Sequence, residues 1–175
     1  MKINKKKGIL FWITGLSGSG KTSVGKKVYK KISKKYGKTI LLNGDDLRKI
    51  FNLKKFSYNE RYKIALSYSK FCENIINQKI NIIFTTVSMF NKVREYNKKK
   101  IENYVEIYIA TNIKDIIKNN KKKIYKIRNK KNIVGLDIKF EKPKSPTIKI
   151  NNDFNTNIND LSKKLIDLID NKLKY

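Results

Sequence analysis

Residues 15–22 read Gly-Leu-Ser-Gly-Ser-Gly-Lys-Thr, which fits the phosphate-binding pattern G-x-x-x-x-G-K-[ST]. The apolar run of residues 8–14 leads directly into this stretch, and a segment with helical periodicity follows from Lys21. A strand, a glycine-rich loop and a helix in this order are the context that the pattern requires. We therefore predict a phosphate-binding loop (P-loop) here, in preference to a chance glycine-rich turn.

The chemistry of such a loop follows from its residue types. Glycines let the backbone curl so that consecutive N–H groups point at one anion, and the helix that begins near Lys21 adds the positive end of its dipole. Lys21 can then bridge the outer phosphates of a nucleotide, and the Thr22 hydroxyl can hold Mg²⁺. The residues expected to bind ATP and Mg²⁺ are Gly15, Leu16, Ser17, Gly18, Ser19, Gly20, Lys21, Thr22 and Ser23.

Composition narrows the class of protein. The 175 residues, of which 39% are hydrophobic, fit one globular domain with a core. The chain has no histidine, which excludes Ser-His-Asp and Cys-His catalysis and histidine-ligated metal sites. The single cysteine, Cys72, lies in an apolar helical stretch and is expected to be a buried thiol in a reducing cytoplasm. The apolar runs are too short to cross a bilayer, so we expect a cytoplasmic protein with no membrane partner.

The net charge of +28 raises the question of a nucleic-acid partner. Lysine, however, is spread along the whole chain, arginine is scarce, and Asn and Ile are abundant. AT-rich codons account for this combination. We expect no specific nucleic-acid partner and only weak, nonspecific binding at low salt. A dedicated nucleic-acid-binding protein is the alternative that the charge alone motivates.

Strand-like and helix-like segments alternate along the chain, which predicts an α/β fold with a mostly parallel sheet wrapped by helices. The expected strands are residues 9–14, 38–42, 80–86, 104–110 and 147–150, and the expected helices are residues 22–36, 47–51, 58–77, 92–103, 113–118 and 159–173. Ligands should bind at the carboxyl ends of the strands. Residues 119–146 are basic and lack apolar periodicity. We interpret them as a mobile lid, with a disordered basic loop as the alternative.

Length and motifs together favour a small kinase. No Asn-Lys pair continues into the N-K-x-D pattern of guanine-binding GTPases, and the chain is too short for a helicase-type second domain. The acceptor of a small kinase should bind after the second strand, facing the γ-phosphate. That position holds Asn43-Gly44-Asp45-Asp46-Leu47-Arg48.

Four patches together resemble the adenylylsulfate (APS) kinase family, whose members phosphorylate the 3′-hydroxyl of a ribose with ATP. The first is the P-loop. Residues 43–48 resemble D-G-D-x-x-R, residues 56–61 resemble F-S-x-x-x-R, and residues 134–146 resemble T-G-I-D followed by E-x-P-x-x-P. The resemblance covers nearly the whole chain. It implies a three-layer P-loop kinase fold that forms a single domain over residues 1–175.

The resemblance also implies roles for individual side chains. Asp45 would act with Lys21 in catalysis, bind Mg²⁺ with Thr22, and orient or deprotonate the acceptor hydroxyl. The two arginines would grip acidic groups on the 5′ side of the acceptor, and Phe56 would stack on its base. The lid lysine would neutralise phosphate charge. The expected substrate-binding residues are Asp45, Arg48, Phe56, Arg61, Ser88, Lys126 and Gly135.

Some of these assignments have structural alternatives. Arg48 and Arg61 could form surface ion pairs, Phe56 could belong to the core, and Asp45 could cap the helix that follows it.

The acceptor half departs from the family pattern. Asn43 replaces an aspartate, Ile64 and Leu66 stand where Asn and Arg are expected, Ile133 replaces an aromatic residue, and Asn91 follows S-M-F in place of an arginine after S-P-F. These changes alter the hydrogen bonds available to the acceptor. We expect APS, the intermediate of sulfate assimilation, because the four patches fit that family best. Cytidine diphosphoramidate, phosphorylated in capsule modification, is the alternative acceptor.

Two further readings stay open at this point. Loss of catalysis with retained nucleotide binding is a reading from another functional class, motivated by the missing carboxylate at Asn43. Members of the family are often dimers, so the resemblance makes a homodimer an expectation.

Overall fold

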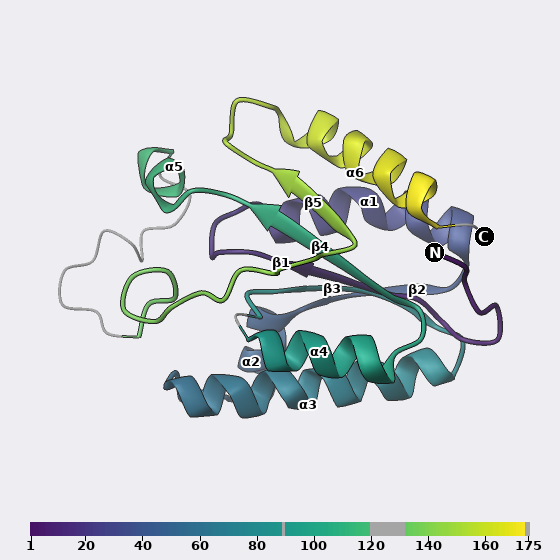
Figure 1. The fold of residues 1–175 in the computed structure, drawn as a ribbon, viewed down its shortest axis with the longest axis horizontal. Coiled ribbons are helices and arrows are strands. Elements are labelled where there is room, and N and C mark those ends of the chain that lie inside the picture. Colours follow the sequence, from purple (N-terminus) through teal and green to yellow (C-terminus); the bar gives the residue numbers. More distant parts are fainter. Residues whose placement is uncertain (89, 120–131, 174–175) are drawn as a thin grey trace.

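A five-stranded parallel sheet, in the order β2-β3-β1-β4-β5, forms the centre of the computed structural model, which describes residues 1–88, 90–119 and 132–173 (Figure 1). All four strand pairings are parallel. The strands are β1 (Leu10–Thr14), β2 (Thr39–Asn43), β3 (Asn81–Thr86), β4 (Tyr104–Ala110) and β5 (Ile148–Asn151). The predicted α/β class with a parallel sheet is confirmed.

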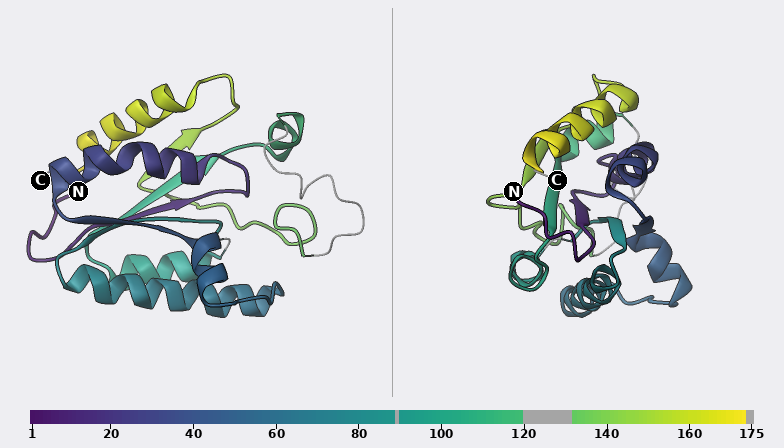
Figure 2. Two further views of the ribbon diagram at one scale, coloured as in Figure 1. Left: turned by 180° about the vertical axis from the view of Figure 1, so that it is seen from behind. Right: turned by 90° about the vertical axis from the view of Figure 1, so that its right-hand side faces the viewer.

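Helices cover both faces of the sheet, which makes three layers. Helices α1 (Lys21–Tyr36) and α6 (Ile158–Lys172) lie on one face. Helices α3 (Tyr58–Asn77) and α4 (Asn91–Lys100) lie on the other face, as the views in Figure 2 also show. Two short helices, α2 (Gly44–Ile50) and α5 (Ile113–Lys118), directly follow the carboxyl ends of β2 and β4.

Two predicted boundaries differ by three residues, each for a local reason. Helix α2 begins at Gly44, not at residue 47, because the Asn43 side chain caps it. Helix α4 ends at Lys100, not at residue 103. The Asn103 side chain donates to the carbonyls of Asn4 and Gly8 at 2.9 and 3.1 Å, and these bonds hold it in the turn before β4.

The central strand β1 is buried along its whole length. Its residues alternate between two apolar clusters, one on each face of the sheet. On the α3/α4 face the Trp12 ring stacks on Phe84 of β3, with 4.8 Å between ring centroids. Burial on both faces explains why these strands are nearly continuous apolar runs and not alternating ones.

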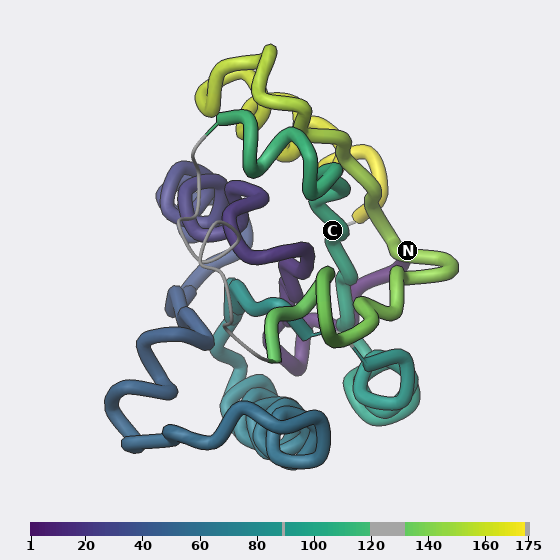
Figure 3. Tube along the Cα trace, turned by 90° about the vertical axis from the view of Figure 1, so that its left-hand side faces the viewer, coloured from purple at the N-terminus to yellow at the C-terminus, as the bar shows by residue number. Residues whose placement is uncertain are grey.

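The parallel arrangement brings the segments that follow three strands to one edge of the molecule. Strands β1, β2 and β3 all end there, and Figure 3 looks onto this edge. The P-loop, helix α2 and residues 87–88 follow these strands directly. Of the predicted lid, residues 120–131 lie outside the described residues, and residues 132–146 form a loop with a single isolated bridge between Val134 and Ile138. The lid therefore stays a prediction.

Cys72 provides a test of the core. Its side chain is fully buried in α3, and burial raises the pKa of the thiol far above its ordinary value. Because only the exposed thiolate reacts, we expect no labelling by iodoacetamide in native buffer at pH 8. One adduct per chain should form in guanidinium chloride, as intact-mass spectrometry would record. Fast labelling of the native protein would show that α3 opens readily.

Candidate active site

The P-loop connects β1 to α1 as predicted. Gly15, Gly18 and Gly20 have φ angles of 155°, 83° and 92°, a region that side chains other than glycine rarely adopt. A Cβ atom at Gly15 would lie 2.5 Å from the carbonyl oxygen of Ile109. Glycine is therefore required there by close packing as well as by conformation.

Lys21 begins α1, and its side chain is only 8% exposed. Its Nζ atom donates to the carbonyl oxygen of Leu16 at 2.6 Å, so the ammonium group lies over the loop. The first N–H groups of a helix lack partners within the helix. The loop amides, the start of α1 and the Lys21 ammonium together favour an anion at this place.

A cavity of about 780 Å³ opens beside the P-loop. This volume is within the range of about 300–1,000 Å³ typical of small-molecule sites. Besides the P-loop it is lined by residues of α1, of the junction between β2 and α2, of α2, of the end of β3 and of the segment after β5: Lys26, Asn43, Asp45, Asp46, Lys49, residues 85–87, Asn152, Phe154, Thr156, Asn157 and Ile158. We call it the donor cleft.

Sequence reasoning missed the residues that follow β5. The Asn152 side chain donates to the carbonyl of Ser19 at 3.0 Å and so connects the end of β5 to the P-loop. Phe154 and Thr156 line the same cleft. The available signal was their position directly after the last predicted strand, at the edge where ligands bind.

Asn43 occupies the junction between β2 and α2. Its Oδ1 atom accepts from the backbone N–H groups of Asp45 and Asp46, at 2.8 and 3.3 Å. Its Nδ2 atom donates to the hydroxyls of Thr22 and Thr85, at 2.7 and 3.1 Å. The alternative in which Asp45 caps the helix is wrong, because Asn43 is the cap. The Asp45 side chain is instead exposed and lines the donor cleft.

A second, smaller cavity of about 60 Å³ adjoins the donor cleft. We call it the acceptor pocket. Asp45, Thr86 and Val87 line both cavities. The remaining lining residues are Gly44, Arg48, Arg61, Ile64, Ala65, Tyr68, Ser88 and Phe90. Asp45 therefore lies at the boundary, where a group in one cavity meets a group in the other.

Phe56 lies against two arginines that line this pocket, although it does not line the pocket itself. Its ring is 46% exposed, so the alternative that it belongs to the core is wrong. The guanidinium carbons of Arg48 and Arg61 lie 4.3 and 5.1 Å from the ring centroid. Arg61 donates to the carbonyls of Phe56 and Asn132, at 2.8 and 3.0 Å.

The two arginines lie close enough to affect each other. The pKa of Arg61 is lowered from its ordinary value, mainly by burial and then by the positive charge of Arg48. Repulsion between two cations is relieved when an anion binds between them. The pair is thus suited to a doubly charged or multiply oxygenated anionic group.

The structure brings most of the predicted acceptor residues together, but not all. Ser88 lines the acceptor pocket, and its buried hydroxyl has no hydrogen-bond partner among the described residues. Gly135 does not line this pocket and packs against Leu16 instead, where a Cβ would lie 3.0 Å from a Leu16 methyl. Lys126 lies outside the described residues, as does Met89.

Of the positions that depart from the family pattern, some line the acceptor pocket and others do not. Ile64 lines the acceptor pocket. Leu66 does not line it, and Ile133 is buried against Ile116 in a small cluster under α5. Within the described part of the chain, no helix is long and apolar enough to span a membrane.

Comparisons with known proteins agree with this geometry. The family model described as adenylylsulphate kinase matches residues 7–151. The chain belongs to this family. It is a phosphotransferase, an ATP-dependent nucleotide 3′-kinase.

Two curated relatives bear different names. The chain is 38% identical over 165 residues to cytidine diphosphoramidate kinase of Campylobacter jejuni, and the match covers 93% of this chain and 96% of the relative. It is 36% identical over 154 residues to adenylyl-sulfate kinase of Clostridium acetobutylicum, covering 85% and 77%. Among solved structures, it is similar to the Mycobacterium tuberculosis APS kinase CysC in complex with AMPPNP and APS. That match has a TM-score of 0.82 and 26% identity, and covers 94% of this chain and 98% of that one.

The double role of Asn43 can be tested by substitution. Asn43→Ala removes the helix cap, and we expect the free energy of unfolding to fall by about 1–2 kcal/mol in urea titrations. Asn43→Asp keeps the Oδ1 acceptor and should lose less. If both variants lose the same amount, the donation to Thr22 and Thr85 carries the stabilisation, and the cap does not.

Proposed function

We propose that this kinase transfers the γ-phosphate of ATP to the 3′-hydroxyl of cytidine diphosphoramidate. The observation that carries this choice is the acceptor pocket, in which the arginine pair is kept while Ile64 supplies an apolar wall. The resemblance places an asparagine at this position, and its loss leaves fewer hydrogen bonds for a purine acceptor. The Campylobacter jejuni relative, matched over nearly the full length of both chains, supports the same choice.

APS is the second candidate acceptor. The four motifs of the sequence favour it, and so does the relative named adenylyl-sulfate kinase at 36% identity. Both acceptors present a ribose 3′-hydroxyl and an anionic 5′ side. In either case the 5′ group binds Arg48 and Arg61, and the base stacks on Phe56.

The residues around the Thr22 hydroxyl fit Mg²⁺. Hydroxyl and carboxylate oxygens are ligands that Mg²⁺ accepts, and the ion usually relies on one or two protein groups plus substrate phosphates. Thr22 and Asp45 line one cleft and are the groups that would hold it. A bound Mg²⁺ would neutralise charge on the transferred phosphate. The Asn43 amide donates to the Thr22 hydroxyl and orients it for this role.

The protein's own contribution to the reaction is positioning and charge. Lys21 and the P-loop amides hold the outer phosphates at the end of the donor cleft. Asp45, at the boundary of the two cavities, orients the 3′-hydroxyl and accepts its proton as the hydroxyl oxygen bonds to the γ-phosphorus and the bond from that phosphorus to ADP breaks. The arginine pair fixes the acceptor at the opposite end. A homodimer and a cytoplasmic location remain predictions from the sequence.

The acceptor is decided by a transfer assay with radiolabelled ATP. We expect phosphate transfer to cytidine diphosphoramidate, little transfer to CDP or APS, and none in the Lys21→Ala variant or without acceptor. Efficient transfer to APS alone would instead support the second candidate. Binding of ATP with transfer to none of the three would overturn the proposal and favour a catalytically degenerate nucleotide-binding protein.

The role of Asp45 is tested with Asp45→Asn, which keeps the shape and removes the proton acceptor. We expect kcat to fall by about 10²–10⁴-fold, the usual contribution of a general base. Asp46→Asn is the matched control, because Asp46 is also exposed in α2 and lines the donor cleft but not the acceptor pocket. An equal loss in both variants would point to the shared charge near the metal and away from a base at Asp45.

A further inference from the structure

Arg94, in the first turn of α4, is buried beside the acceptor pocket, with 3% of its side chain exposed. All three guanidinium nitrogens are engaged. Nη1 donates to the carbonyl of Ser88 at 2.5 Å, and Nη2 donates to the Asn91 side chain and to the carbonyl of Glu141. Nε lies 3.3 Å from a carboxylate oxygen of Glu106. Arg94 is not among the residues that we expect to bind the substrate, so these contacts need a separate explanation.

Glu106 of β4 sets the orientation of Arg94. Its side chain is 1% exposed, and a buried carboxylate requires a cation close to it. Burial raises the pKa of Glu106, while the charges of Lys98 and Arg94 oppose that rise. Lys98 reaches the other carboxylate oxygen at 3.5 Å from the exposed side. With Nε held by Glu106, the two remaining nitrogens of the planar fork point at backbone carbonyls.

The Nη1 atom of Arg94 holds the turn after β3. Ser88 has a φ angle of 30°, a strained value for a residue with a side chain. Its carbonyl accepts from Arg94 and, at 3.4 Å, from the Thr14 hydroxyl, which also donates to the Val87 carbonyl at 2.7 Å. Val87 and Ser88 both line the acceptor pocket. These bonds therefore determine where one wall of the pocket lies.

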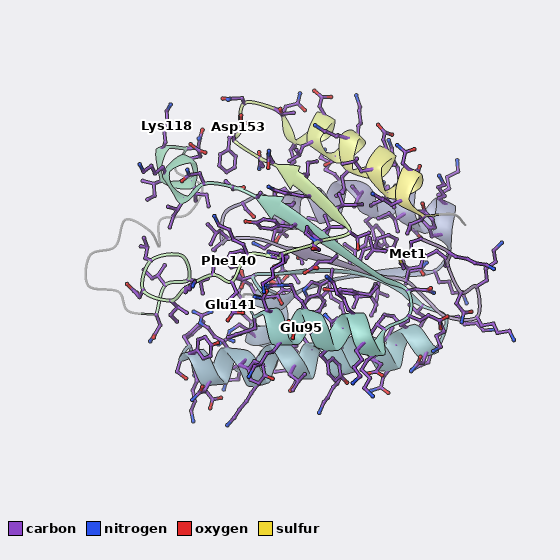
Figure 4. All side chains as sticks on the ribbon, in the orientation of Figure 1. Met1, Glu95, Lys118, Phe140, Glu141 and Asp153 are labelled. Carbon is purple, nitrogen blue, oxygen red and sulfur yellow. The ribbon has the colours of Figure 1, made fainter. Side chains whose placement is uncertain are left out.

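The Nη2 atom of Arg94 contacts the segment of residues 132–142 at Glu141. The Glu141 carboxylate accepts from the Asn91 N–H at 2.7 Å and from the Tyr58 hydroxyl at 3.3 Å, so it joins the starts of α4 and α3. Figure 4 shows Glu141 beside α4, at the end of this loop. At the start of the same segment, the Asn132 carbonyl accepts from Arg61. The segment thus contacts Arg61, a lining residue of the acceptor pocket, at one end and Arg94 at the other.

We propose that Arg94, oriented by Glu106 and joined to Glu141, is a positioning residue for the acceptor. It holds the turn at Ser88, which lines the acceptor pocket, against Glu141 and so sets the position of that wall of the pocket. It does not touch the reacting groups. The consequence for catalysis rests on the proposed function, because that function places the 5′ group of the acceptor against Arg48 and Arg61 of this pocket. The donor cleft shares only Asp45, Thr86 and Val87 with the pocket and should be affected little.

A kinetic test uses Arg94→Lys, which keeps a cation beside Glu106 but cannot reach three acceptors at once. We expect the acceptor KM to rise about tenfold or more, as loss of hydrogen bonds from a charged group predicts, while the ATP KM stays within about twofold. Lys98→Gln is the matched control, because Lys98 also pairs with Glu106 but does not contact Ser88 or Glu141. It should leave both KM values unchanged. Glu141→Ala is a second variant, which removes the carboxylate that accepts from Asn91 and Tyr58, and it should also raise the acceptor KM.

Hydrogen exchange gives a readout that does not depend on activity. Arg94→Lys should speed exchange at the amides of residues 86–88 and 132–142 and leave residues 15–22 unchanged. Equal protection in the variant and the wild type, or KM values for ATP and acceptor that rise together, would overturn the proposal. A wild-type protein that transfers phosphate to no acceptor would overturn the proposed function instead, and the exchange pattern would still decide the role of Arg94.

Discussion

The side-chain amide of Asn43 is the contact on which the geometry of this site depends. One side chain caps α2 through its oxygen and holds the hydroxyls of Thr22 and Thr85 through its nitrogen. It thereby connects the ends of β2 and β3 to the first turn of α1 and to α2. Because a cap determines where a helix begins, it also determines that Asp45 lies between the donor cleft and the acceptor pocket. An aspartate here could accept in the same way but could not donate to both hydroxyls.

The two cavities differ in the chemical groups that line them. The donor cleft relies on backbone amides, a helix start and one lysine, which suit any nucleoside triphosphate. The acceptor pocket relies on side chains from three separate segments, with Arg48 and Arg61 against Phe56 and with Ser88 after β3. Backbone features persist under substitution, whereas side-chain features change with each residue. This difference explains how relatives of this chain keep one kinase framework and bear names with different acceptors.

The positive charge of the chain contributes little to this specificity. Among the described residues, the lysines that contribute to the net charge of +28 are mostly exposed and distributed over the surface. Beside the exposed Lys26 and Lys49 of the donor cleft, the site has cations that are held in place: Lys21 over the P-loop, the arginine pair at Phe56, and Arg94 in the buried network with Glu106. A held cation acts at one point, whereas exposed charges are screened by salt within about 10 Å.

Much of the fold could be predicted from local pattern. Helix 58–77, strand 104–110 and helix 113–118 match their predicted bounds, because strong periodicity and side-chain caps define them. The P-loop was equally visible, since its glycines are required by backbone conformation and by contact with Ile109. The start of α2 was placed three residues late, because an asparagine at the end of a strand does not reveal that its side chain will cap the next helix.

The sequence by itself determined the strand–loop–helix with the phosphate-binding pattern, the alternating order of elements and the family. These depend on residue type and on neighbours close in the chain. Only the tertiary structure decided that Gly135 lies apart from the acceptor pocket, that Asn152 supports the P-loop, and that Arg94 joins Ser88 to Glu141. The reason is physical: these contacts join residues that are far apart in sequence, and they form only when parallel strands bring their carboxyl ends to one edge.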